Sequence, residues 1–364
     1  FDASSQDLRT AMRQNLAGQK LLPVLGPGLS PHVGEIRRQV AREWAERVGF
    51  PMSTYRWTDF SEVAQYLSVR IQPNTPRLWL IEDTYARVTD LAAGIPDFPK
   101  PALKPIEMEA KDDAAPLQAL VSAVGHAKRE EGKKSNAPTA YTLLAKLPFP
   151  VYLTADPTDL LADALRDEGK DPIVRVARWN EAALAHDEAL EEAREKRDKA
   201  AGLDPTVPIE PTPERPFVCK LFGDLARPTT LVLTQDQYLD YMLNLARGLK
   251  KGNSRLRVIP DELGMRLTTN ALLLVGFEVE SWEFRVLLKC LIAVRGDYLK
   301  ARTVELVRSV SAQLDPDASV DPNLTRIYLA QHLSKNLGHA DLYWGTPLEF
   351  LAELSRDYFK NVGP

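Results

Sequence analysis

The sequence predicts an α/β fold built on a mostly parallel β-sheet with helices on both faces. Short aliphatic runs at residues 20–25 and 271–276 have the composition of strands that are buried on both sides. Helix-length segments follow these runs, so that strands and helices alternate along the chain. The chain has 364 residues, 44% of them hydrophobic and 26% charged, which is enough for one large α/β domain.

The first half of the chain is predicted to begin with a short helix, a strand and a glycine turn. Leu8, Met12 and Leu16 recur at helical spacing within residues 5–18. The strand at residues 20–25 ends at Gly26-Pro-Gly-Leu-Ser30, and a helix follows at residues 35–48. The remaining elements are helix-length segments in 50–91, a proline-rich loop at 94–116, helices at 117–129 and 139–147, a buried strand at 148–154 and a helix at 160–167 that Thr158 or Asp159 could cap.

The second half contains a segment that is expected to leave the core. Residues 181–201 form a charged helix with little apolar face, and residues 202–216 hold five prolines. We therefore expect an exposed insertion at 181–216. The other predicted elements are strands at 217–222, 231–233 and 271–276, helices at 236–249 and 286–294, and a helical extension at 296–364 that includes the aromatic stretch Leu342-Tyr-Trp344. This division gives a single domain over 1–364 with a core at about 20–295.

Composition and charge exclude several classes of protein. The net charge of −4 and the dispersed Lys and Arg residues argue against nucleic acid as a partner. No run reaches the roughly 20 apolar residues of a membrane span. Cys219 and Cys290 lie in apolar surroundings, which indicates buried free thiols, no zinc site and a cytoplasmic location. Because the chain opens at Phe1, we expect it to be part of a longer polypeptide.

The glycine turn is compatible with phosphate binding. Glycines let a backbone approach a phosphate, and the following helix offers free N–H groups at its positive end. The third glycine of the dinucleotide-binding pattern is absent, however, since Pro31 and His32 follow Ser30. Taken alone, this turn favours a purely structural interpretation.

Four segments in a fixed order resemble the sirtuin-like family. Val24-Leu-Gly-Pro-Gly-Leu-Ser30 is similar to the family's nucleotide-binding turn, usually Gly-Ala-Gly-x-Ser. Thr154-Ala-Asp-Pro-Thr-Asp-Leu-Leu161 resembles Thr-Thr-Asn-Tyr-Asp-Asp-Leu-Leu. Lys220-Leu-Phe-Gly-Asp-Leu225 resembles Leu-His-Gly-Asp, and Leu274-Val-Gly-Phe-Glu-Val-Glu-Ser-Trp-Glu-Phe-Arg285 resembles Gly-Tyr-Ser-x-x-Asp-Trp-Asp-Phe-Arg. The ordered set is specific, although each motif alone is only moderately so.

This resemblance implies a Rossmann-like sheet that binds NAD or ADP-ribose at the carboxyl ends of its strands. In the bacterial defence branch, against phage, such domains cleave NAD at the nicotinamide bond. The expected cofactor-binding residues are Gly26, Pro27, Gly28, Leu29, Ser30, Thr154, Asp156, Gly276 and Phe277. The deacetylase branch is excluded, because two cysteines cannot form its four-cysteine zinc module.

The sequence departs from the family at the two positions that carry the chemistry. Asp156 stands where the family has Asn, and Phe222 stands where it has His. Phenylalanine cannot accept or donate a proton, so it cannot act as a general base. Lys220 could line the pocket only in a different strand register. His32 is the one histidine that the sequence places near the expected pocket.

Three hypotheses remain open at this point. The chain is an NAD- or ADP-ribose-binding module of a larger bacterial defence protein, with weak, altered or lost cleavage. Alternatively, it is an active NAD hydrolase that uses Asp156 in a rearranged site, or a catalytically dead scaffold. Other domains of the same longer chain, or further copies of it in a homo-oligomer, are the expected protein partners.

Overall fold

The computed structural model describes most of the chain, with gaps. The described residues are 10, 12–29, 31–96, 98, 113–204, 210–248, 258–260, 263, 266, 267, 269–277, 282–295, 303–308, 324, 327, 328, 331 and 339–362. Within them, seven strands form one sheet in the order β3-β4-β2-β1-β5-β6-β7, and all neighbouring strands are parallel. The strands are β1 (Leu21–Leu25), β2 (Val151–Thr154), β3 (Ile173–Val176), β4 (Phe217–Lys220), β5 (Ala271–Val275), β6 (Thr303–Arg308) and β7 (His339–Trp344).

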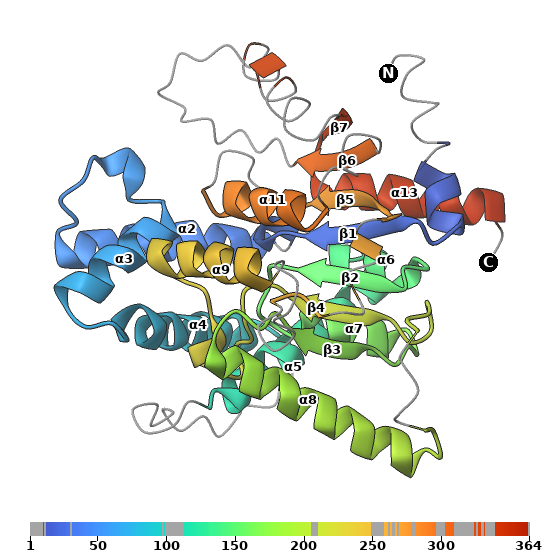
Figure 1. The fold of residues 1–364 in the computed structure, drawn as a ribbon, viewed down its shortest axis with the longest axis horizontal. Helices are drawn as coiled ribbons and strands as arrows, with labels where there is room; N and C mark the ends of the chain where they lie inside the picture. The colour runs from blue at the N-terminus through green and yellow to red at the C-terminus, as the bar shows by residue number, and fades with distance from the viewer. Residues whose placement is uncertain are drawn as a thin grey trace.

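Helices connect the strands and cover both faces of the sheet, which confirms the predicted α/β class. They are α2 (Pro31–Val48), α3 (Phe60–Arg70), α4 (Thr75–Ala93), α5 (Ala115–Lys134), α6 (Ala140–Lys146), α7 (Leu160–Asp167), α8 (Glu181–Ala200), α9 (Gln235–Gly248), α11 (Trp282–Arg295) and α13 (Pro347–Val362). Short 3₁₀ turns occur at η1 (Pro27–Leu29), η2 (Thr54–Arg56) and η3 (Pro228–Thr230). Figure 1 shows α2, α3 and α4 grouped beyond the end of the sheet from which β1 leads into α2.

The two faces of the sheet build two separate hydrophobic cores. Along β1, Leu22 and Val24 pack in the core that includes residues of α9 and α11. Leu21 and Leu25 pack in the opposite core, with residues of α6, α7 and α13. This alternation follows from the two-residue period of a strand. It explains why β1 and β5 are apolar at every position.

Three strands have no counterpart among the predicted elements, and one predicted strand is wrong. Among the described strands, β3 pairs only with β4, and it carries a buried Arg175, which breaks the apolar run that would have revealed it. β6 and β7 extend the sheet after residue 295, so the extension expected to be helical also contributes strands. Residues 231–233 form no strand, although Val232 N donates to Phe222 O at 3.1 Å.

The charged helix α8 is more buried than the sequence predicted. It connects β3 to β4 and buries four side chains, three of them charged. Asp187 is fully buried and accepts hydrogen bonds from Arg175 (2.8 and 2.7 Å), from Val176 N (2.9 Å) and from Arg178 (2.6 Å). Asp187 and Glu191 thus form ion pairs with Arg175 of β3, while the buried Arg194 and Asp198 pair with each other within α8. The boundaries proposed for an insertion at 181–216 stay a prediction.

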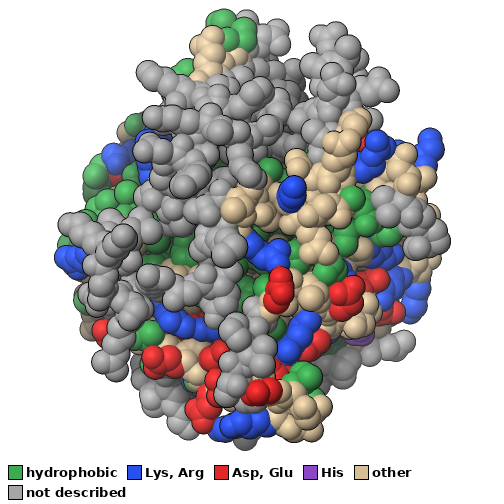
Figure 2. Space-filling view, turned by 45° about the vertical axis from the view of Figure 1, so that its right-hand side comes forward, with side chains coloured by type: hydrophobic (Ala, Val, Ile, Leu, Met, Phe, Trp, Pro, Cys, Tyr) green, Lys and Arg blue, Asp and Glu red, His purple; other side chains and the backbone are tan. Residues whose placement is uncertain are grey.

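Elsewhere the described surface carries mixed charge. Figure 2 shows Lys and Arg side chains interspersed with Asp and Glu over the described part of the face in view. No helix among the described residues is long and apolar enough to cross a bilayer.

Candidate functional site

The glycine turn after β1 packs directly against the turn after β5. Gly28 N donates to Gly276 O at 2.9 Å, and Gly26 N donates to Val275 O at 2.7 Å. A Cβ atom at Gly26 would clash with the Gly276 carbonyl, and one at Gly276 would lie 2.7 Å from Leu29 N. Gly276 also has a φ of +79°, which favours glycine. The glycines are therefore needed for backbone packing between two turns.

This packing limits what the turn can offer a phosphate. The N–H groups of Gly26, Gly28 and Leu29 all donate within the protein, and Pro27 has none. The helix α2 begins immediately afterwards, at Pro31. Any pyrophosphate held here would have to use the start of α2. Ser30 lies outside the described residues, and the side chain of His32 is not described.

Asp156 lies in the turn after β2 and is held by three hydrogen bonds. Its Oδ2 accepts from the Tyr141 hydroxyl at 2.5 Å, and its Oδ1 accepts from Thr158 N at 2.9 Å. Asp156 N donates to Thr154 Oγ1 at 3.1 Å. Asp156 is only 4% exposed, and these contacts hold its carboxylate in a fixed position. Thr154 contributes through this contact and is itself buried.

Tyr141 was not foreseen as a site residue. It lies on α6, and burial together with the negative charge of Asp156 raises the pKa of its hydroxyl well above the ordinary value. The hydroxyl thus stays protonated and donates to Asp156. No motif in the sequence marks this residue, because its contact with Asp156 depends on how α6 packs beside β2.

Phe222 follows β4 and is part of an aromatic cluster. Its ring centroid lies 5.1 Å from that of Tyr238 and 5.5 Å from that of Tyr241, both in edge-to-face geometry. The next residue, Gly223, has a φ of +96° and packs against the backbone of Thr230. Phe222 is thus a structural side chain that also faces the cavity described below.

Lys220 does not line the cavity; it joins the turns after β2 and β4. The side chain is 1% exposed, and its Nζ lies 2.6 Å from Asp159 Oδ1 and 3.0 Å from Asp224 Oδ2. Burial alone would lower the pKa of Lys220, but the charges of Asp224 and Asp159 raise it above the ordinary value. Burial would raise the pKa of Asp224, yet Lys220 and a contact with His186 (3.2 Å) hold it well below the usual range. No pattern in the sequence marks His186, which α8 brings to Asp224.

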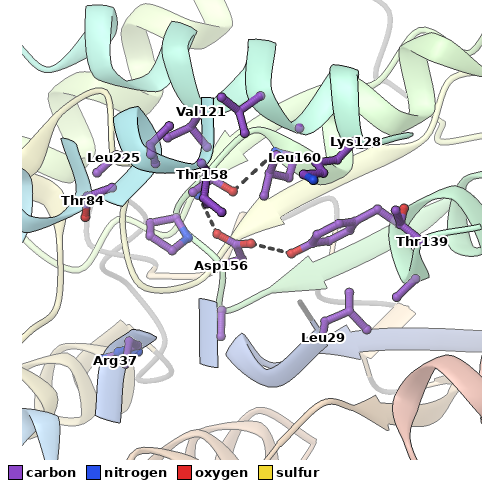
Figure 3. A pocket seen from close by; sticks show the side chains of 18 of the residues that line it. Leu29, Arg37, Thr84, Val121, Lys128, Thr139, Asp156, Thr158, Leu160 and Leu225 are labelled. Carbon is purple, nitrogen blue, oxygen red and sulfur yellow. Dashed lines mark hydrogen bonds between the residues drawn. The ribbon is translucent and has the colours of Figure 1, made fainter. Parts of the chain in front are cut away.

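One cavity brings together three of the predicted positions. Its volume is about 440 Å³, within the range of small-molecule sites. Leu29, Asp156 and Phe222, which follow β1, β2 and β4, all line it. Figure 3 shows Asp156 in the middle of the view, with Leu29 and Arg37 below it and Val121, Lys128 and Leu160 above. Gly26, Gly28, Gly276 and Phe277 are not part of this wall.

The cavity wall is largely apolar. Among the described residues that line it, Asp156 is the one carboxylate, and there is no histidine or cysteine. Much of the wall comes from α4 and α5, two helices that the sequence analysis did not connect with the site. The described part of the chain also holds no cluster of His, Cys, Asp or Glu that could bind a metal ion.

Other side chains considered in the sequence have structural surroundings. Trp282 stacks edge-on against Tyr238 at 5.7 Å, and the Trp179 indole N–H donates to Thr230 O at 2.7 Å. Arg285 is exposed, whereas Glu278 lies outside the described residues. Cys219 is a buried free thiol, and nothing is described for the side chain of Cys290.

Comparison with known proteins adds one finding. No curated protein matches the chain. A family model described as the SIR2-like domain matches residues 158–319, from the turn after β2 past β4, β5 and β6. This match confirms the sirtuin-like resemblance over residues 158–319.

Proposed function

We propose that this chain is an NAD- or ADP-ribose-binding module whose NAD cleavage is weak, altered or lost. The observation that carries the proposal is the shared cavity of Leu29, Asp156 and Phe222 at the carboxyl ends of three parallel strands. Open parallel sheets bind ligands at this edge. The SIR2-like match points to a nucleotide ligand of the NAD type.

The residues fit the ribose end of such a ligand better than its phosphates. The apolar wall suits a nicotinamide ring or a ribose face, and Asp156 supplies acceptor oxygens. The pyrophosphate would depend on the start of α2, since the N–H groups of the glycine turn are already used. Phe222 stands at the expected histidine position, where it has no proton to exchange. These features support binding with impaired cleavage.

The wider role follows from the bacterial defence resemblance. We infer that the module works in the cytoplasm inside a larger anti-phage protein, through other domains of that chain or further copies of it. Nucleic acid and membrane are not among the proposed partners.

Two measurements on the purified chain test this proposal. Titration calorimetry with NAD and with ADP-ribose should give binding, and chromatography of an NAD incubation should show little or no free nicotinamide. Asp156→Ala should weaken binding, whereas Asp163→Ala, which removes a carboxylate of α7 that does not line the cavity, should not. Absence of binding by the native chain to either nucleotide would overturn the proposal.

A second candidate is an active NAD hydrolase that uses Asp156. The buried carboxylate, fixed by Tyr141 and Thr158 N, could stabilise the positive charge that develops on the ribose. Rapid nicotinamide release that disappears in Asp156→Ala would favour this candidate over the first.

A restoration experiment tests the role assigned to the two divergent positions. The double variant Asp156→Asn with Phe222→His rebuilds the residue pair that the resemblance implies for cleavage. We expect nicotinamide release to rise by at least about tenfold over the native chain, a modest share of what a general base supplies. A double variant that binds NAD as tightly as the native chain yet releases no more nicotinamide would contradict the assignment.

A further inference from the structure

The part of the cavity between α4 and α5 is chemically distinct from the nucleotide turn. We call it the α4–α5 lobe; its apolar wall is formed by Val88, Leu91, Val121, Val124 and Leu225. In the described structure, the glycine turn contributes only Leu29 to the whole cavity. A wall of this composition binds hydrocarbon and offers nothing to a pyrophosphate.

The lobe has a cationic end on α5. Lys128 and Arg129 both line the cavity, and Arg129 is only 4% exposed. Arg129 lies against Gly125, where a Cβ atom would be 3.2 Å from Nη1. Its Nε donates to Asp167 Oδ2 at 2.7 Å, but its Nη2 has no hydrogen-bond partner among the described residues. A buried guanidinium nitrogen without an acceptor is costly, and a ligand carboxylate would supply one.

Lys128 is free to take part. Its Nζ lies 3.2 Å from Glu131, but both side chains are well exposed, at 42% and 67%. Such surface pairs have little energetic weight. Asp156, in the middle of the cavity, would repel an anion. The two charged regions therefore fix the direction in which an amphipathic anion can bind.

We propose that the α4–α5 lobe binds a straight-chain aliphatic monocarboxylate. The chain packs against the apolar wall, and the carboxylate accepts hydrogen bonds from Arg129 and Lys128. This site goes beyond nucleotide binding and does not require it.

Three probes with one hydrocarbon chain and different head groups test the site. Calorimetric titration of the native chain is carried out with decanoate, decan-1-ol and decyltrimethylammonium, the two ions below their critical micelle concentrations and the alcohol below its solubility limit. Decanoate should bind at least about tenfold more tightly than the other two, as one charge-assisted hydrogen bond predicts. Equal affinity for all three probes would indicate that only the hydrocarbon chain is recognised. Tightest binding of decyltrimethylammonium would indicate that the head group lies next to Asp156. Either result, or no binding of decanoate, overturns the proposal.

Variants locate the site. Arg129→Met combined with Asp167→Asn removes both members of this partly buried ion pair. The double variant should weaken decanoate binding about tenfold and leave decan-1-ol binding unchanged. Lys133→Gln removes a charge one turn further along α5, outside the cavity wall, and should leave decanoate binding unchanged. Val121→Trp fills the lobe and should abolish decanoate binding. A folded Val121→Trp chain, by circular dichroism, that binds decanoate normally would refute the location.

The two proposals fail separately. The native chain is titrated with NAD and with decanoate in independent experiments, and the head-group comparison among the three probes involves no nucleotide. Loss of NAD binding in the native chain would leave the decanoate result unaffected.

Discussion

Replacing Lys220 by Met should destabilise the fold far more than an ordinary lysine substitution. Lys220 is the buried cation between Asp159 and Asp224, and its removal leaves two carboxylates facing each other without a counter-charge. Removing one partner of a buried ion pair lowers the free energy of unfolding by about 3–5 kcal/mol. Asp159 is 29% exposed and Asp224 keeps His186 and Ala226 N as partners, so we expect the lower value, about 3 kcal/mol.

The assay is urea unfolding followed by circular dichroism. Lys196→Met is the matched control, because that lysine pairs with Glu192 on the surface and is 72% exposed. It should change the free energy of unfolding by less than about 0.5 kcal/mol. Combining Lys220→Met with Asp224→Asn should recover part of the loss, as expected for two residues in contact. If Lys220→Met behaves like Lys196→Met, the ion-pair reasoning is refuted.

The same pair gives a pH dependence with a definite sign. The pKa of Asp224 is lowered in the folded state, so its contribution to stability is complete above the unfolded pKa of about 3.9 and is lost as pH falls below it. The free-energy gap between the native chain and Lys220→Met should therefore be full at pH 7 and shrink below about pH 4. A gap that stays constant into acid would show that Asp224 is not the partner that matters.

Two further substitutions test the turn packing and the Asp156 contact. Gly276→Ala should lower the free energy of unfolding by more than about 2 kcal/mol, because it adds a clash with Leu29 N to the cost of a positive φ. Gly202→Ala is the control, since Gly202 has a φ of +77° and open space around it. In the same thermal melt this control should show the φ cost alone, about 1 kcal/mol. Tyr141→Phe should cost about 1.5–3 kcal/mol and weaken ADP-ribose binding, since Asp156 loses a charge-assisted hydrogen bond. Tyr152→Phe is the control, because it removes an equally buried hydroxyl that donates to a backbone carbonyl. It should cost only about 1 kcal/mol and leave ADP-ribose binding unchanged. If both variants have the same effect on melting and on ADP-ribose binding, the Asp156 contact has no special role.

The sequence predicts those elements of the fold whose burial is evident from their own residues. β1 and β5 are apolar throughout because helices cover them on both sides, and this pattern is visible without a structure. β3 is hidden because Arg175 interrupts it, and the compensating Asp187 is far along the chain on α8. A buried charge in a strand is tolerated only when tertiary packing brings a partner to it. Such a strand therefore cannot be recognised from its local sequence.

The candidate site likewise has one part that the sequence predicts and one part that it does not. Asp156 and Phe222 could be placed because each comes just after a strand, and the carboxyl ends of parallel strands meet at one edge. The contributions of Tyr141, Val121 and Arg129 could not, because they depend on how α5 and α6 pack beside that edge. Residues on strand ends are thus predictable, whereas the helical wall that gives the cavity its apolar character is not.

The glycine turn shows why a motif and its usual ligand must be argued separately. Gly26 and Gly28 match a nucleotide-binding turn, yet the structure accounts for both by their contact with Gly276. The same three glycines would be required in a chain that never met a phosphate. The case for a nucleotide therefore rests on Asp156 and the cavity that it lines. A substitution of Asp156 is a more decisive test than one in the turn, because Gly26→Ala would disrupt the backbone contact with Gly276 whether or not NAD binds.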